Sequence, residues 1–208
     1  MKNTTTDFLT DEELTLILSK ADELTYKMKN IYKNGRVFDT EMVSDYRNTA
    51  ILHVLAYTGI RGEELASAVM NDVAISEHEG TLRVRSKNNA ERELHLPYKV
   101  CYRLKNYFEQ RFLLDNWYDA SDETKKRVGN EPLFLSNKRG HLTNRHIRRI
   151  VDAVGEAAGF TDEKNKLYPH IFRQTFAHSL LNKRGVSVEM AQKILGHDHI
   201  ESTKRYRK

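Results

Sequence analysis

The sequence predicts an α+β fold that is mostly α-helical and carries one small antiparallel β-sheet. Apolar residues recur every three or four positions through most of the chain, which is typical of amphipathic helices. Strict alternation of apolar and polar residues is confined to 81–86 and 91–96, which indicates two strands around a turn. The 208 residues are enough for one domain with a core, and no internal repeat is visible.

Helices are expected before the sheet. Thr10-Asp11-Glu12-Glu13 reads as a capping box that opens the first of them. A second helix covers about 44–58, and Gly59 breaks it. Arg61 lies at this break, just before a short helix begun by Glu63-Glu64. An arginine at such a junction is expected to point away from the core, toward a cleft.

The sheet and a long helix follow. The alternating segments 81–86 and 91–96 are joined by a short polar turn, which places Lys87 at the tip of a hairpin. An amphipathic helix is expected over about 98–114, and Cys101 falls on its apolar stripe as buried packing. The polar stretch 116–131 is interpreted as a surface loop.

The C-terminal half is predicted to be helical. Thr143 caps a helix whose apolar face is formed by Ile147, Ile150, Val151, Val154 and Ala158, and Gly159 ends it. Pro169 starts a helix of about 170–184. Ser187 caps a further short helix, which Gly196 terminates.

Composition limits the class of protein. Hydrophobic residues make up 39% of the chain and charged residues 30%, and no apolar run approaches the roughly 20 residues of a membrane helix. No signal peptide is apparent, and a single cysteine excludes an intramolecular disulfide framework. These features predict a cytoplasmic protein, associated with the nucleoid if it binds DNA.

Positive charge is concentrated in one stretch. The net charge is +5, and the pI is about 9.2. Residues 137–149 contain no acid, and they hold Lys138, Arg139, Arg145, Arg148 and Arg149. Such a run is either a solvated face or a surface for nucleic acid, and these five residues are the candidates for contacts with DNA phosphates.

The last part of the chain gathers side chains suited to phosphate chemistry. His170 and Arg173 lie three residues apart, and His197 and Tyr206 follow. A guanidinium binds two phosphate oxygens, an imidazole moves a proton, and a phenol can attack phosphorus. With Arg61 upstream, this set predicts phosphodiester cleavage without a metal ion or other cofactor. A competing interpretation is a zinc site formed by His170, His178, His197 and His199.

Six segments, in one order, match a known pattern. They are Thr58-Gly59-Ile60-Arg61-Gly62-Glu63-Glu64-Leu65, Lys87 between paired strands, Leu133-Phe134-Leu135-Ser136 with Leu142-Thr143, Pro169-His170-Ile171-Phe172-Arg173-Gln174-Thr175-Phe176-Ala177, Leu195-Gly196-His197, and Ser202-Thr203-Lys204-Arg205-Tyr206. Because of these segments, the chain from residue 8 to residue 206 resembles the catalytic domain of the tyrosine recombinases, the phage-integrase family. The resemblance implies the DNA breaking-rejoining catalytic fold.

The resemblance also implies a role for each residue. Tyr206 would attack the scissile phosphate, giving a 3′-phosphotyrosyl link and a free 5′-hydroxyl. Arg61 and Arg173 would bind the non-bridging oxygens, Lys87 would protonate the leaving oxygen, His170 would help remove the tyrosine proton, and His197 would donate a hydrogen bond to the phosphate. The covalent ester conserves bond energy, so strands can be rejoined without ATP or metal.

The implied function is site-specific recombination of double-stranded DNA, for integrating or excising a mobile element. The alternatives are a type IB topoisomerase and a non-catalytic DNA-binding regulator with the same fold. Residues 1–208 are expected to form the catalytic domain without the core-binding domain, either as a fragment of a longer integrase or as a short family member. The chain ends two residues after Tyr206. The isolated chain is therefore expected to bind DNA weakly as a monomer, whereas the full-length protein is expected to form a homo-oligomer on DNA.

Overall fold

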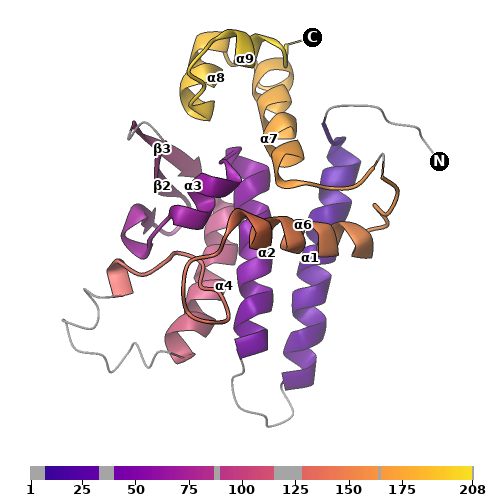
Figure 1. Cartoon of the computed structure of the whole chain (residues 1–208), viewed down its shortest axis with the longest axis vertical. Helices are drawn as coiled ribbons and strands as arrows, with labels where there is room; N and C mark the ends of the chain where they lie inside the picture. The colour runs from indigo at the N-terminus through magenta and orange to yellow at the C-terminus, as the bar shows by residue number, and fades with distance from the viewer. Residues whose placement is uncertain (1–7, 33–39, 87–89, 115–127, 164, 208) are drawn as a thin grey trace.

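The computed structural model describes residues 8–32, 40–86, 90–114, 128–163 and 165–207 (Figure 1). Its helices and strands are α1 (Asp11–Tyr32), α2 (Thr40–Thr58), α3 (Gly62–Ser67), the 3-10 turn η1 (Met70–Asp72), β1 (Val73–Ile75), β2 (Gly80–Arg85), β3 (Glu91–Leu96), α4 (Tyr98–Leu114), α6 (Asn144–Ala157), α7 (Pro169–His178), the π-helical turn η3 (Ser179–Lys183), α8 (Val188–Leu195) and α9 (Glu201–Lys204). The predicted α+β class is confirmed.

Helix α2 forms the centre of the main core. It lies between α1 and α4 (Figure 1). Ile51, Leu52, Val54 and Leu55 are buried on several sides of the helix, as expected for a helix with neighbours all round. The capping box of α1 forms as predicted, because Thr10 N donates to Glu13 Oε2 at 2.8 Å and Glu13 N donates to Thr10 Oγ1 at 3.2 Å. Helix α2 begins four residues earlier than predicted, at Thr40 rather than at residue 44.

The sheet has the antiparallel order β1-β2-β3. Leu82 pairs with Leu94, and Val84 pairs with Arg92. Alternate residues of β2 and β3 are buried against the core, as the sequence pattern predicts. Lys87, the predicted hairpin lysine, lies outside the described residues, between the ends of β2 and β3.

Helix α4 spans the predicted residues, and Cys101 is buried in it as expected. Part of the stretch 116–131 lies outside the described residues. The prediction of a surface loop is wrong at its end, where Val128 and Gly129 are buried. The reason is a tertiary contact: the Glu131 carboxylate pairs with the buried Arg111 guanidinium at 2.8 Å, which draws this segment inward.

The C-terminal helices form a second cluster, drawn in orange and yellow in Figure 1. Phe176, Leu180, Leu195 and Tyr206 are among its buried members. The predicted single helix of about 170–184 changes at Ser179 into a π-helical turn, in which Arg184 N donates to the Ser179 carbonyl five residues back. Among the described residues, no helix combines the length and the apolar character that crossing a membrane requires.

Candidate active site

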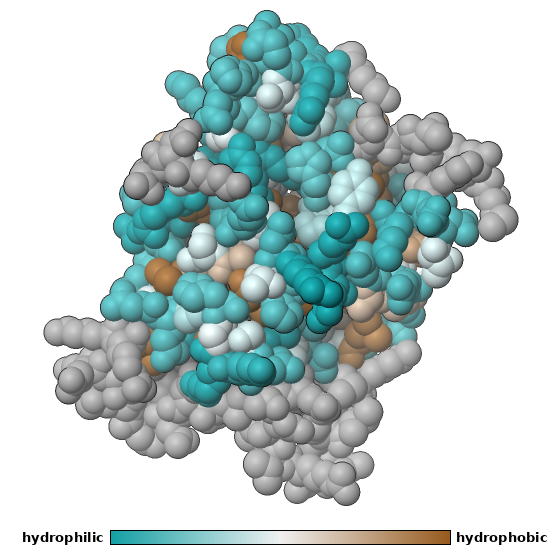
Figure 2. Space-filling view, viewed as in Figure 1, coloured by the Kyte–Doolittle hydropathy of each residue, from teal (hydrophilic) through white to brown (hydrophobic). Residues whose placement is uncertain are grey.

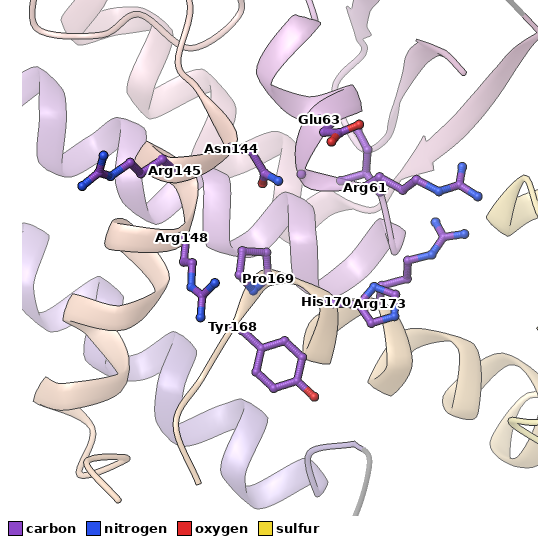
Figure 3. A pocket seen from close by; sticks show the side chains of 11 residues that line it. Arg61, Glu63, Asn144, Arg145, Arg148, Tyr168, Pro169, His170 and Arg173 are labelled. Carbon is purple, nitrogen blue, oxygen red and sulfur yellow. The ribbon is translucent and has the colours of Figure 1, made fainter. Parts of the chain in front are cut away.

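Arg61 is placed by the break between α2 and α3. Gly59 takes a left-handed conformation with φ of 63°, which ends α2, and Arg61 becomes the N-cap residue of α3. Arg61 N donates to Glu64 Oε2 at 2.9 Å, and its Nη1 lies 3.0 Å from Glu64 Oε1. Its Nη2 donates to the Gly196 carbonyl at 2.6 Å. The expectation that Arg61 points away from the core is confirmed, because it lines a pocket (Figure 3).

Arg173 lies beneath Arg61 and is only 2% exposed. Its Nη1 donates to the Gly59 carbonyl at 2.7 Å, and its Nη2 donates to the Leu195 carbonyl at 2.7 Å. Burial, together with the nearby charge of Arg61, lowers the pKa of Arg173 to about 9. The guanidinium therefore remains positively charged at pH 7, and its charge lacks the full hydration of an exposed arginine.

The pocket between these arginines and α6 has a volume of about 690 Å³. It is lined from the start of α3 by Arg61 and Glu63, from α6 by Asn144, Arg145 and Arg148, and from α7 by Tyr168, Pro169, His170 and Arg173. In Figure 3 the guanidinium groups of Arg61 and Arg173 lie side by side, with His170 next to Arg173. Positive groups from three separate segments thus face one hollow.

The five predicted DNA-binding residues do not all lie at one place. Arg145 and Arg148 line the pocket of Arg61 and Arg173. Arg149 and Lys138 instead line a neighbouring hollow of about 490 Å³, together with the buried Arg47. Arg139 is exposed in the turn before α6, where it takes a φ of 60°.

His170 lies at the start of α7 and lines the pocket. Its pKa is lowered by partial desolvation in the pocket, and next by the charges of Arg173, Arg205 and Arg61. The imidazole is therefore neutral at pH 7 and can accept a proton.

His197 follows the left-handed Gly196 that ends α8. Its Nδ1 lies 2.8 Å from Oγ1 of Thr203, which is fully buried. Burial, with the charges of Arg173 and Arg61 next, lowers the pKa of His197 to about 4. A neutral ring has one N–H and one acceptor nitrogen, and the Thr203 hydroxyl can bond to Nδ1 in either role, so the tautomer decides which atom donates.

Tyr206 packs in the C-terminal cluster and is 7% exposed. Arg205 Nη2 donates to the Tyr206 hydroxyl at 2.8 Å, and the Asn182 side chain donates to the Tyr206 carbonyl at 2.7 Å. The ring centroids of Tyr206 and His197 lie 6.3 Å apart. Tyr206 is not among the residues that line the pocket of Arg61 and Arg173. The structure thus brings Arg61, His170 and Arg173 to one pocket and holds Tyr206 beside it, beneath Arg205.

Comparison with known proteins identifies the family. Residues 9–208 match the model of the phage integrase family. The chain belongs to this family. Tyrosine recombinase XerC of Thermodesulfovibrio yellowstonii is 31% identical over 160 residues, which cover 77% of this chain and 49% of that protein. Tyrosine recombinase XerC of Oceanobacillus iheyensis is 33% identical over 162 residues, covering 77% of this chain and 48% of that protein.

The fold of this integrase-family chain is also that of solved recombinases. The crystal structure of XerA recombinase has a TM-score of 0.70 and 28% identity, and the match covers 96% of this chain and 59% of that one. XerH recombinase bound to its difH substrate matches in fold with a TM-score of 0.70 and 23% identity, covering 97% of this chain and 50% of that one. This chain spans about half the length of the XerC proteins that it matches.

Two residues of the candidate site were not predicted from the sequence. Glu64 is buried and accepts hydrogen bonds from both Arg61 and Arg92. Burial by itself raises the pKa of its carboxyl, but the hydrogen bonds and charge of Arg92 and Arg61 hold the pKa below its ordinary value. Arg92 could have been recognised from the sequence, because it occupies an inward position of β3, in phase with the buried Leu94 and Leu96. A charged residue at such a position requires a partner inside the protein.

The histidines do not form the alternative zinc site. In the part of the chain that the structure describes, no group of three or more His, Cys, Asp or Glu side chains could hold a metal ion. His178 stacks on Phe8 instead, with ring centroids 3.8 Å apart. The interpretation of His170, His178, His197 and His199 as zinc ligands is therefore wrong.

Proposed function

We propose that this chain cleaves and rejoins DNA strands through a 3′-phosphotyrosyl ester, as the catalytic part of a site-specific recombinase. The observation that carries the proposal is the pairing of Arg61 and Arg173 at one pocket, beside His170 and next to the segment that carries His197 and Tyr206. Membership of the phage integrase family and the fold shared with XerA support it.

The two arginines would bind the scissile phosphate. Each has five N–H groups. The hydrogen bonds of Arg61 to Glu64 and Gly196 use one N–H each from its Nη1 and Nη2, and those of Arg173 to Gly59 and Leu195 do the same. Further N–H groups of both side chains remain to donate to the non-bridging oxygens. Fixed donors of this kind stabilise the negative charge that grows on the phosphate in the transition state.

The proton transfers would fall to His170 and Lys87. His170 is neutral at pH 7 and can take the proton that Tyr206 loses as it attacks phosphorus. Lys87, which lies in the sequence between β2 and β3, would protonate the leaving 5′-oxygen. His197 would donate a hydrogen bond to the phosphate from its Nε2, with Thr203 donating to Nδ1.

Tyr206 would be the nucleophile. Its hydroxyl is held by Arg205, and its ring is packed against the C-terminal cluster. Tyr206 does not line the pocket, so we expect the segment after α9, which carries it, to shift until the phenol reaches a phosphate bound by Arg61 and Arg173. We expect DNA binding to provide this movement.

Double-stranded DNA would be the partner. Arg145 and Arg148 share the pocket with Arg61, so they are placed to bind phosphates next to the scissile one. Lys138, Arg139 and Arg149 lie alongside and would extend the same contact. We propose that 1–208 is the catalytic domain of a longer integrase, that a further domain clamps the DNA, and that the whole protein acts as a homo-oligomer on DNA, integrating or excising a mobile element.

The competing proposal is a DNA-binding regulator that keeps the fold without catalysis. The observation that favours it is that Tyr206 is buried and does not line the arginine pocket. Such a regulator would bind DNA in a salt-dependent manner, and Tyr206→Phe would leave its behaviour unchanged.

Nicked duplexes of varied sequence separate the two proposals. The nick lets the cleaved end diffuse away and traps the covalent intermediate as an SDS-resistant band. We expect a band without metal or ATP from the native chain and none from Tyr206→Phe. DNA binding without any band would support the regulator.

A further inference from the structure

The C-terminal end of α8 presents three successive carbonyls to three arginines from different elements. Arg92 Nε donates to Ile194 at 3.1 Å, Arg173 Nη2 donates to Leu195 at 2.7 Å, and Arg61 Nη2 donates to Gly196 at 2.6 Å. The last carbonyls of a helix have no partner within the helix, and they carry a partial negative charge. This end of α8 therefore organises the two arginines of the pocket together with a third.

The third arginine, Arg92, also forms two hydrogen bonds with the Glu64 carboxylate. Its Nη1 donates to Glu64 Oε1 at 2.7 Å, and its Nη2 donates to Glu64 Oε2 at 2.8 Å. The side chain of Arg92 is 13% exposed and that of Glu64 is 5% exposed, so the pair is largely removed from water. A two-point contact of this kind fixes both the distance and the orientation of the carboxylate.

Gly196 shows how closely Arg92 packs against the end of α8. A Cβ atom added at Gly196 would lie 2.8 Å from Arg92 Nη1, and the residue has a φ of 65°. Both features favour glycine here. The backbone that carries the Gly196 carbonyl and leads into His197 thus rests directly on the Arg92 guanidinium.

We propose that Arg92 is a positioning residue for the phosphate-binding arginines, an inference that rests on the proposed function. Arg92 does not line the pocket, and it acts through Glu64 and the end of α8. Glu64 holds the backbone and the guanidinium of Arg61. With Arg92 as its counter-ion, Glu64 is balanced by a charge other than Arg61. The charge of Arg61 is then available to the phosphate.

Loss of Arg92 would leave Glu64 with Arg61 as its one arginine partner among the contacts described above. The buried carboxylate would keep Arg61 as its remaining arginine, and the guanidinium would be drawn toward Glu64 and away from the scissile phosphate. The Ile194 carbonyl would lose its donor at the same time, which loosens the segment carrying Gly196 and His197.

The test compares two scissile linkages in the nicked duplex on which the native chain reacts fastest, at saturating DNA. One linkage is the normal phosphate. The other is a methylphosphonate, in which a methyl group replaces one non-bridging oxygen and removes the negative charge. We expect Arg92→Gln to slow adduct formation on the phosphate by about 10- to 100-fold, since small displacements of positioned groups have effects of this size. The loss should be clearly smaller on the methylphosphonate, which has no charge for Arg61 to bind.

Arg92→Lys and Arg103→Gln complete the comparison. Lysine keeps the charge but cannot span both carboxylate oxygens and the Ile194 carbonyl, so we expect partial loss with the same preference between linkages. Arg92→Lys also replaces Arg92→Gln as the test variant if thermal denaturation shows that Arg92→Gln does not fold. Arg103→Gln removes an arginine that pairs with Asp22 at 2.6 Å between α4 and α1, and it should leave both rates unchanged.

Equal losses on the two linkages, or a native rate for Arg92→Gln, would overturn the positioning role while leaving the proposed function intact. A native chain that binds DNA but forms no adduct would overturn the proposed function, and the role of Arg92 would fall with it.

Discussion

His170 and His197 lie among arginines, and this surrounding positive charge sets their protonation. Partial desolvation, with the charges of Arg173 and its neighbours, lowers the pKa of both imidazoles. Neutral histidines suit the proposed chemistry, because a neutral ring can accept the Tyr206 proton or donate a single hydrogen bond. A bound phosphate would add negative charge to the same pocket and partly offset the effect of the arginines.

The pH dependence of adduct formation tests the role of His170. A base must be deprotonated, and its pKa lies below the ordinary value of 6.5. We expect the single-turnover rate to rise with pH in the range below 6.5 and to be level around pH 7. His170→Gln should lower the rate and abolish this rise. A rise centred above pH 7 in the native chain, unchanged in His170→Gln, would contradict the assignment.

The pH dependence of stability tests the environment of His197. Its pKa is about 4 in the folded chain, against an ordinary value of 6.5. As the pH falls from 6.5 to 4, the unfolded chain binds a proton that the folded chain does not, so the free energy of unfolding decreases. In thermal denaturation at several pH values, His197→Gln should reduce this loss. His78→Gln, which changes an exposed histidine, should not.

At the scale of elements, the break between α2 and α3 at Gly59 helps to place Arg61 and Arg173 at the same pocket. Its left-handed conformation ends α2 before Arg61, and its carbonyl accepts a hydrogen bond from Arg173. A Cβ atom at this position would lie 2.5 Å from Phe176 Cδ1, so the glycine is also needed for packing against α7.

Two alanine substitutions separate backbone strain from packing at this break. Gly59→Ala and Gly185→Ala both place alanine at a φ near 64°, which costs about 1–2 kcal/mol. Only Gly59→Ala also meets Phe176, whereas no described atom lies within 4 Å of a Cβ at Gly185. We expect Gly59→Ala to be less stable than Gly185→Ala by about 1–3 kcal/mol in urea denaturation. Equal stabilities would show that α7 yields to the added methyl group.

Elements with local signals could be predicted from the sequence. The hydrogen bonds of Thr10 and of Thr143 at the starts of α1 and α6, and the alternation in β2 and β3, involve residues close in the chain. The π-helical turn could not be predicted in this way. In this turn the Asn182 side chain donates to the carbonyl of Tyr206, 24 residues away in the chain. A local sequence pattern does not predict a contact over that separation.

The same distinction applies to the candidate site. Arg61, His170, Arg173, His197 and Tyr206 are each recognisable from short segments with distinctive neighbours. The contact of Arg92 with Glu64 spans 28 residues and arises only when β3 packs beside α3. The position of Tyr206 outside the arginine pocket likewise depends on tertiary packing.

At the scale of the whole molecule, one face carries the residues that we propose to bind DNA. Helix α6 crosses the front of the view in Figure 1, and hydrophilic residues cover most of the described surface in the same view in Figure 2. Arg145 and Arg148 on α6 are among the residues that line the arginine pocket, so a duplex lying over α6 would reach Arg61 and Arg173. Binding at this face should depend mainly on phosphate contacts.

The salt dependence of DNA binding tests this face. Replacing both Arg145 and Arg148 by glutamine should weaken binding to all sequences alike. It should also reduce the slope of log affinity against log salt by about 1–2, since each phosphate contact contributes roughly 0.9. The matched control is Lys20→Gln with Arg103→Gln, which removes two charges that already pair with Glu23 and Asp22. An unchanged slope in the α6 variant would show that this face does not contact DNA.

The most direct test of the central claim is to locate the bond in the covalent adduct. The adduct from a nicked duplex would be digested with protease and nuclease and analysed by mass spectrometry. We predict a peptide whose Tyr206 side chain carries the 3′-phosphate of the cleaved strand, together with a free 5′-hydroxyl on the released DNA. A link to another residue, or a tyrosine joined to a 5′-phosphate, would contradict the account.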